Sequence, residues 1–372
     1  MVQIDIQRTF HPVGQGAFYT EVFTGNDGKH FVMVYDCGTS TGKDEMEVDL
    51  DSQIEAFKKS LEPYCQIDAL FLSHFHVDHI SGLGKLLENI NVRYTIIPML
   101  TLPALTVCRV ENFIKYDADK ALSAEKVIQE LFLSKGQSDI FGKVLVVAYD
   151  EDRPREEKVG NVDYPQRLGN GEVILNGKKW EAFPFWEYIP FNSIKANDQR
   201  TIDFMDGLKQ IPEAWNGDEL NVNRLIRGCR TKVKDLYKKV MNNENDNLYT
   251  LVVESRPASG VFPVPDVRQS RCLYMGDFDW KGYSGLWCRF NGVYSLNEIG
   301  TIQVPHHGSK ENWHDDLLTG KERLYVISAG TTNTYNHPNY WVVNSMWENG
   351  HGVMVVSEKM KSKGELHYFV AI

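Results

Sequence analysis

The stretch His74-Phe75-His76-Val77-Asp78-His79 decides the fold, because it places four metal-binding side chains within six residues. It follows an apolar run typical of a buried strand, Ile67-Asp68-Ala69-Leu70-Phe71-Leu72. Imidazole nitrogens and carboxylate oxygens are common ligands of zinc, manganese and iron. Four donors so close in sequence cannot all reach one tetrahedral ion without strain, so we expect two ions.

The alternative is that these histidines have no ligand role and are either surface residues or hydrogen-bonded core residues at a strand end. The chain has only 11 histidines in 372 residues, so three within six positions are unusual. The following Ser81-Gly82-Leu83-Gly84 also fits a tight turn into a helix, where glycine lets the backbone approach a bound group. We therefore interpret the stretch as a metal-hydrolase site, in which two ions lower the pKa of water to about 7 and make hydroxide available as a nucleophile.

Length and composition set the broad class. A chain of 372 residues exceeds the usual single core, which predicts either two domains or one large domain with an insertion. No apolar run approaches the roughly 18 residues that cross a bilayer, and the first residues lack the apolar core of a signal peptide. The six cysteines form no C-x-x-C pair, which suits a reducing compartment. We expect a soluble, cytoplasmic protein.

The net charge of −10 argues against a long basic stripe for nucleic acid. One segment is locally basic and has partly helical spacing. Its basic residues are Arg224, Arg227, Arg230, Lys232, Lys234, Lys238 and Lys239. It is either a solvated helix face or a patch that steers a substrate.

Three regions follow one another along the chain. Residues 1–98 and 245–372 are rich in strand-like runs, whereas residues 100–243 have helical texture with a polar, charged stretch at 150–161. We predict a single domain over residues 1–372, with two sheet-rich halves, 1–98 and 245–372, and a mostly helical insertion, 100–243. The expected strands are 18–23, 31–35, 69–72, 94–98, 249–254, 271–275, 299–304, 324–328, 352–357 and 366–372, and the expected helices are 110–134 and 202–241.

The C-terminal half offers further candidate ligands at strand ends. Gly276-Asp277 follows one strand, and a carboxylate there is well placed to bridge two ions. Pro305-His306-His307-Gly308-Ser309 follows the next strand and forms a second histidine cluster. The loop 328–338 then carries His337, although asparagine and proline chemistry also explains it as a surface turn.

In this order, the motifs resemble the metallo-β-lactamase superfamily, and within it the soluble domain of the DNA-uptake protein ComEC and its free-standing relatives. The narrower likeness rests on Val13-Gly14-Gln15-Gly16, on His306-His307-Gly308-Ser309 and on Asn333-Thr334-Tyr335-Asn336-His337-Pro338. The segments 34–38, 245–252 and 274–277 also match the general pattern. The resemblance implies an α/β fold, a four-layer αβ/βα sandwich.

The resemblance also implies roles for single residues. It makes His74 and His76 ligands of a first divalent ion, Asp78 and His79 ligands of a second, and Asp277 the bridge, with zinc or manganese as the metal. It favours His306 as a further ligand of the second ion and His307 as a substrate contact, although the sequence alone does not order this pair. Asp36 would orient the ligand loop. His337 would contact a phosphate or protonate the leaving oxygen, with Ser309, Asn333 and Tyr335 nearby.

One departure affects the first ion. Many superfamily members have another ligand histidine before the bridging aspartate, but this chain has no histidine from 80 to 305. ComEC-like members commonly lack it as well. The first site would be weaker or would take a hard ion such as manganese.

Three functions remain open. The first is a phosphodiesterase or nuclease that acts on DNA through a metal-activated hydroxide, with Asp78, Asp277 and His337 as catalytic residues. The second is a hydrolase of a small phosphodiester or cyclic nucleotide, which fits the acidic chain because only one phosphate has to be held. The third is a non-catalytic metal-binding sensor or partner protein. Lactone, thioester or β-lactam hydrolysis is less favoured, and no membrane partner is expected.

Overall fold

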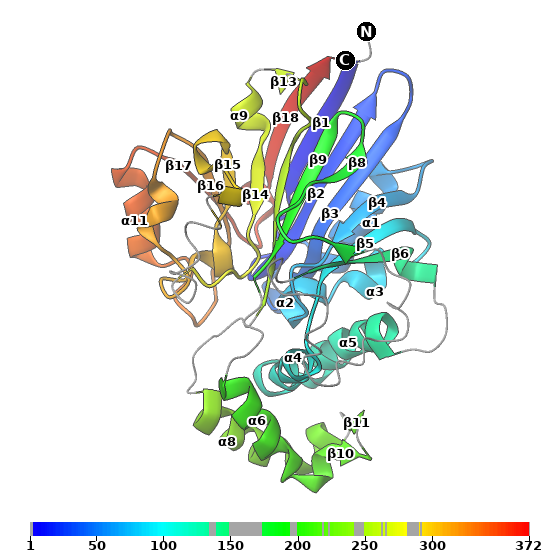
Figure 1. The fold of residues 1–372 in the computed structure, drawn as a ribbon, viewed down its shortest axis with the longest axis vertical. Coiled ribbons are helices and arrows are strands. Elements are labelled where there is room, and N and C mark those ends of the chain that lie inside the picture. Colours follow the sequence, from blue (N-terminus) through cyan, green and yellow to red (C-terminus); the bar gives the residue numbers. More distant parts are fainter. Residues whose placement is uncertain are drawn as a thin grey trace.

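The computed structural model describes residues 3–133, 139–148, 173–193, 199–217, 219–221, 224–241, 249–261, 263–264, 266–280, 290 and 292–371. Two β-sheets lie face to face at its centre, with helices on their outer sides (Figure 1). The terminal strands β1 (Gln3–Phe10) and β18 (Gly364–Ala371) pair antiparallel, so both ends of the chain lie at the same end of the sandwich.

The first sheet has nine described strands and changes from antiparallel to parallel pairing at β3. Met33 and Tyr35 of β3 face the other sheet, while Val34 between them packs toward the helices. Both faces are therefore buried, which explains the nearly continuous apolar strands. The strand order is β13 (Pro263–Val264), β18, β1, β2 (Gly16–Gly25), β3 (His30–Thr39), β4 (Gln66–Phe71), β5 (Asn91–Pro98), β6 (Lys143–Val147) and β7 (Val173–Ile174).

The second sheet has seven described strands and is parallel on one side. The strands β14 to β17 run parallel, and β12 pairs antiparallel with both β14 and β9. The strand order is β17 (Gly352–Val356), β16 (Leu324–Ser328), β15 (Thr301–Gln303), β14 (Cys272–Tyr274), β12 (Leu251–Pro257), β9 (Trp186–Asn192) and β8 (Trp180–Phe183).

Helices complete four layers. The outer face of the first sheet packs against a group of helices, and that of the second sheet packs against α11 (Tyr340–Glu348), while aromatic side chains such as Tyr19 and Tyr274 stack between the sheets. The predicted α/β four-layer sandwich is confirmed. The helices on the first sheet are α1 (Leu50–Ser60), α2 (Val77–Ile80), α3 (Leu83–Leu86), α4 (Leu102–Lys115) and α5 (Ala118–Ile128); α9 (Val267–Ser270) follows β13.

Residues 100–243 contain helices and also strands of both sheets. The expected helix 110–134 is broken at residues 116–117, and the expected helix 202–241 is interrupted by a short hairpin, so neither is one continuous helix. The helices α4, α5, α6 (Gln199–Lys209) and α8 (Arg230–Met241) pack together beyond the first sheet, with the small hairpin of β10 (Trp215–Asn216) and β11 (Glu219–Leu220) beside them (Figure 1). The strands β6 to β9 fall in the same segment and extend the two sheets. The division into two halves and an insertion stays a prediction, and the polar stretch 150–161 and residues 245–248 lie outside the described residues.

Local sequence explains where these helices begin. The side chain of Thr101 accepts a hydrogen bond from the Ala104 amide at the start of α4. The side chain of Asp117 accepts one from the Lys120 amide at the start of α5. In the described part of the chain, no helix is both long and apolar enough to span a membrane.

Candidate metal centre

The motif residues meet where the parallel strands of both sheets end. The stretch His74 to His79 follows β4, and Asp277 follows β14. The histidine pair His306 and His307 follows β15, and the loop that carries His337 follows β16. In open α/β sheets, the carboxyl ends of the strands are the usual place for a ligand.

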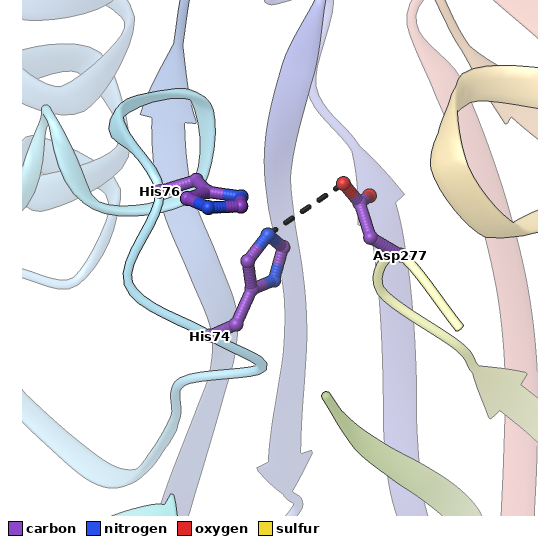
Figure 2. Close-up of side chains that lie close together, drawn as sticks. All are labelled: His74, His76 and Asp277. Atoms are coloured by element: carbon purple, nitrogen blue, oxygen red, sulfur yellow. Dashed lines mark ion pairs between the residues drawn. The ribbon is translucent and has the colours of Figure 1, made fainter. Parts of the chain in front are cut away.

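The first group of candidate ligands consists of His74, His76 and Asp277. Their donor atoms lie within 4.8 Å of one another, and all three side chains are buried. His74 Nε2 is 3.5 Å from Asp277 Oδ2, and Figure 2 shows the two imidazoles and the carboxylate turned toward a common space. This group fits a site with two nitrogen donors and one oxygen donor.

The second group consists of Asp78, His79 and His307, whose donor atoms also lie within 4.8 Å of one another. Asp277 joins the two groups, because its Oδ1 is 3.2 Å from His79 Nε2 while its Oδ2 faces His74. A carboxylate with one oxygen on each group has the geometry of a bridge between two ions. The ligand roles themselves stay predictions.

Hydrogen bonds around Asp36 fix the orientation of two histidines. Asp36 accepts bonds from the amide and hydroxyl of Ser73, at 2.7 and 2.6 Å, and from His79 Nδ1 at 2.7 Å. The Ser73 hydroxyl, having donated to Asp36, accepts from His74 Nδ1 at 2.9 Å. In both rings Nδ1 therefore donates and Nε2 faces Asp277, so each Nε2 can bind an ion when it carries no proton. These contacts agree with the orienting role expected of Asp36, and that role stays a prediction.

The adjacent histidines His306 and His307 both face the centre but point to different carboxylates. His307 Nδ1 donates to the Ser328 carbonyl at 2.8 Å, which leaves Nε2 at 3.3 Å from Asp78 Oδ2. His306 Nδ1 lies 2.7 Å from Asn312 Oδ1, and its Nε2 is 3.8 Å from Asp277 Oδ2. The geometry thus groups His307, rather than the favoured His306, with Asp78 and His79.

The backbone around these residues is strained in a way that aims them. Asp36, His306 and His307 have φ of 55°, 47° and 56°, in the left-handed region that non-glycine residues seldom adopt. Gly276 has φ of 53°, and a Cβ there would lie 2.6 Å from Thr250 Oγ1 and 2.8 Å from Ser73 Cβ. A side chain at 276 would therefore push the Asp277 turn away from the His74 loop.

The charges of the centre suit a cation. Burial would raise the pKa of Asp78 and Asp277, but neighbouring histidines lower both values: His307 and His79 act on Asp78, and His306, His79 and His74 act on Asp277. Burial, followed by the charge of His79, lowers the pKa of His74. Two ionised carboxylates and a neutral imidazole are the protonation states that bind metals.

Two buried nitrogens test whether a metal fits. Nε2 of His74 and Nε2 of His79 have no hydrogen-bond partner among the described residues. Buried polar atoms without partners are rare, and an unseen ion is one of the ordinary explanations. Burial lowers the pKa of His79, but Asp277 and Asp36 raise it well above its usual range, so an ion would have to displace a proton from this ring. Both Nε2 atoms face a space shared with carboxylates, so the residues present fit divalent ions.

A pocket of about 40 Å³ opens onto the two groups. Its wall includes Gln15 and Ser40 from the N-terminal half, Lys115 and Tyr116 from the end of α4, and Tyr335 and His337 from the loop after β16. The ring of Tyr335 stacks on His337 at 5.8 Å between centroids and is 54% exposed, so it forms the outer rim.

Two residues predicted to bind the substrate or to support the site, Asn333 and Ser309, form hydrogen bonds within their own loops. Asn333 donates to the carbonyls of Gly330 and His337 and accepts from the amides of Tyr335 and His337. The hydroxyl of Ser309 accepts from the Glu311 amide. These bonds shape the loops that hold His306, His307 and His337, whereas Tyr335 and His337 themselves reach the pocket.

Sequence reasoning missed the contribution of the helices beyond the first sheet. His76 Nε2 lies 2.7 Å from Glu111 Oε2, so this nitrogen donates and Nδ1 remains for the centre. Glu111 is held in turn by the Tyr237 hydroxyl of α8 and by Lys115 Nζ. Burial opposes the shift, but Cys108 and Glu111 raise the pKa of His76 to about 10, so an ion would have to displace a proton there.

The end of α4 also clamps the motif loop. Asn112 accepts from the Val77 amide at 3.1 Å and donates to the Phe75 carbonyl at 2.8 Å. The Tyr116 hydroxyl donates to Asp78 Oδ1 at 2.9 Å. A general helical pattern covers these residues, and no recognisable motif singles them out.

Part of the chain is similar in sequence to known proteins. Residues 25–119 match the model of the metallo-beta-lactamase superfamily. Ribonuclease J of Mycoplasma pneumoniae is 30% identical over 222 residues, which are 54% of this chain and 34% of that protein. The match therefore spans about a third of the length of this curated relative.

Solved structures with similar arrangements share 10% sequence identity with the chain. A long-form RNase Z from yeast has a TM-score of 0.33 and is matched over 82% of this chain and 32% of its own. YhfI from Bacillus subtilis has a TM-score of 0.39, with 97% and 100% covered, and zinc-bound PqqB from Methylobacterium extorquens has 0.40, with 98% and 99% covered. Residues 25–119 thus match the superfamily that the sequence motifs resemble, and the described residues have the two-sheet, four-layer sandwich expected of the metallo-β-lactamase fold.

Proposed function

We propose that the protein is a metal-dependent hydrolase of phosphodiester bonds, with nucleic acid as its substrate. The observation that carries this proposal is the position of Asp277, whose two oxygens face His74 in one group and His79 in the other. Two divalent ions held by these groups would activate water and clamp the attacking and leaving oxygens of an in-line displacement. Zinc and manganese both suit the nitrogen and oxygen donors.

The residues of this chain then divide the remaining work. Asp36, Ser73 and Glu111 hold the histidine rings in one tautomer each. Lys115 Nζ, at 3.3 Å from Glu111, supplies a cation in the pocket wall that can balance the charge of a phosphate. His306 Nε2 faces the same Asp277 oxygen as His74, and we assign it the position of the histidine that the sequence lacks between 80 and 305.

His337 is better suited to bind a phosphate oxygen than to act as the acid. Burial and then the charges of His307 and His306 lower its pKa to about 3, so its ring is neutral at pH 7. Gln15 Nε2 lies 3.3 Å from its Nδ1 and donates to it, which leaves Nε2–H as a donor. We expect His337→Ala to slow phosphodiesters with good and poor leaving groups by equal factors, whereas a general acid would matter by about 10²-fold for poor leaving groups only.

One assay tests the proposal. The protein is loaded with manganese or zinc and offered single-stranded DNA, duplex DNA, RNA, cyclic dinucleotides and bis-p-nitrophenyl phosphate, with a chelator and the Asp277→Asn variant as controls. Chelator-sensitive cleavage of any nucleic acid supports the proposal. The likeness to ComEC favours DNA and the similarity to ribonuclease J favours RNA, so both strands belong in the assay. Hydrolysis of none of these substrates contradicts the proposal.

The pocket volume favours a second candidate, a hydrolase of small phosphodiesters. The pocket is small, about 40 Å³, and the chain is acidic overall, so a substrate with a single phosphate suits the site. Cleavage of cyclic dinucleotides without cleavage of DNA or RNA would select this alternative.

A further inference from the structure

The helix α8 is strongly basic in an otherwise acidic chain. Within Arg230–Met241 it has five basic residues and one acidic residue, Asp235, while the chain as a whole has a net charge of −10. Lys232 pairs with Glu213, but Lys234, Lys238 and Lys239 are exposed and have no ion-pair partner in the described part of the chain. Arg230, Lys234, Lys238 and Lys239 are called the basic flank below.

Packing fixes the direction in which this flank faces. The buried side of α8, formed by Val233, Tyr237 and Met241, covers the helices next to the sandwich. α8 lies beyond α4 as seen from the two sheets (Figure 1). Lys234, Lys238 and Lys239 are exposed outside this buried side, whereas Arg230 is half-buried and reaches toward the end of α4.

The flank begins at the wall of the pocket. Arg230 Nη2 donates to the Tyr116 carbonyl at 3.1 Å, and the hydroxyl of the same tyrosine donates to Asp78. Lys115, the neighbour of Tyr116, lines the pocket. A chain of positive groups thus leads from the candidate metal centre through Arg230 onto the surface of α8.

The spacing of the flank suits a repeating anion. Arg230, Lys234 and Lys238 recur every four residues, so they lie on one side of the helix about 6 Å apart along its axis. Like charges at this spacing repel and destabilise an isolated helix. A solvated helix face normally relieves the repulsion with interspersed acidic residues, but on this flank Asp235 is the single acidic residue of the helix.

We propose that the basic flank binds the phosphates of a nucleic-acid strand whose scissile bond lies in the pocket. This rests on the proposed function and adds a second binding region, outside the small pocket, for the strand on one side of the cleaved bond. The recognised chemistry is the phosphodiester backbone, so DNA and RNA strands both qualify. It also explains how an acidic protein with a small pocket can act on a polymer.

The test compares two triple variants of the full chain with equal changes of charge. The first is Lys234→Gln/Lys238→Gln/Lys239→Gln. The control is Lys59→Gln/Lys321→Gln/Lys361→Gln, whose lysines are exposed and form no ion pair with any other described residue. Binding of labelled single-stranded DNA and RNA is measured by fluorescence anisotropy over a range of salt concentrations, together with hydrolysis of bis-p-nitrophenyl phosphate.

The flank variant should bind both strands about tenfold more weakly at low salt, and its log–log salt slope should fall by about 2, since each lost contact to a single strand accounts for roughly 0.7. The control should change affinity less than about twofold, and both variants should hydrolyse the small ester as the parent does. Equal losses in both variants, or none in the flank variant, overturn the proposal. So does flank-dependent binding to phosphatidylserine vesicles without binding to either strand.

The outcomes separate this inference from the proposed function. Flank-dependent strand binding without any hydrolysis would contradict the hydrolase and keep the binding region. Hydrolysis of the small ester, together with strand binding that the flank variant does not weaken, would keep the hydrolase and contradict the binding region.

Discussion

The edge of the sandwich and the helices α4 and α8 meet at one pocket but contribute to it differently. The sandwich edge brings the candidate ligands themselves, from four strand ends far apart in sequence. The helices bring Glu111, Asn112 and Tyr116, which contact the motif loop and its side chains. The first set can bind a metal directly, whereas the second can act only through the first. Substitutions in the two sets should therefore change metal binding and turnover in different ways.

The largest expected effect on turnover is that of replacing Asp277, which faces both ligand groups. Asp277→Asn removes the charge that faces both His74 and His79, and it should slow hydrolysis on the order of 10³-fold or more while the fold is retained. Turnover of bis-p-nitrophenyl phosphate and the thermal unfolding curve are measured together. Parent-like turnover in a folded Asp277→Asn protein would contradict the bridging role.

The adjacent histidines provide the next test of the sandwich edge. His307→Ala should lower the metal content by about one ion per chain, because His307 Nε2 faces Asp78 in the second group. His306→Ala should weaken binding of the other ion, since His306 faces the Asp277 oxygen next to His74. Elemental analysis after dialysis against a fixed metal concentration distinguishes the two. If only the His306 variant loses the ion that also depends on Asp78, our assignment of the pair is reversed.

The helices are tested by Glu111→Gln. The substitution keeps the shape but removes the charge that orients His76, so metal affinity should fall about 10–100-fold, as is usual for partners of ligand histidines. Glu125→Gln is the matched control, because Glu125 is a buried carboxylate in the same helical segment and pairs with Arg109 Nη2 at 2.6 Å. Cobalt titrations followed by absorbance give the affinities. Equal losses in both variants would mean that Glu111 serves stability alone.

The smallest expected effect belongs to Tyr116→Phe. It removes one hydrogen bond to Asp78 without removing a ligand, and we expect turnover to fall by up to about tenfold with metal content unchanged. Tyr64→Phe, which removes a surface hydroxyl bonded to the Gly28 carbonyl, should leave turnover as it is. If the Tyr116→Phe protein loses an ion, Tyr116 contributes to metal binding, and our distinction between the strand ends and the helices is wrong.

The fold could be predicted because most strands of the core are apolar on both faces. The expected runs at 31–35 and 324–328 lie within observed strands, and the run at 69–72 overlaps β4, which ends at Phe71. The strands β1 and β9 escaped prediction for physical reasons. β1 contains the fully buried Arg8, which pairs with Glu21 at 2.7 Å, and β9 contains Glu187 and Pro190, residues that seldom occur in a central strand.

The sequence by itself determined which side chains could bind a metal, since donors concentrated at strand ends form a local pattern that can be read along the chain. Only the tertiary structure decided how they are grouped: that Asp277 faces both groups, that His307 faces Asp78, and that Glu111 faces His76. These contacts join residues 35 to 229 positions apart, and helical periodicity gave Glu111 no sign different from any other residue of its helix. Residue types determine which donor atoms are available to a metal. The geometry of the site depends on packing between segments that are distant in sequence, which no local pattern contains.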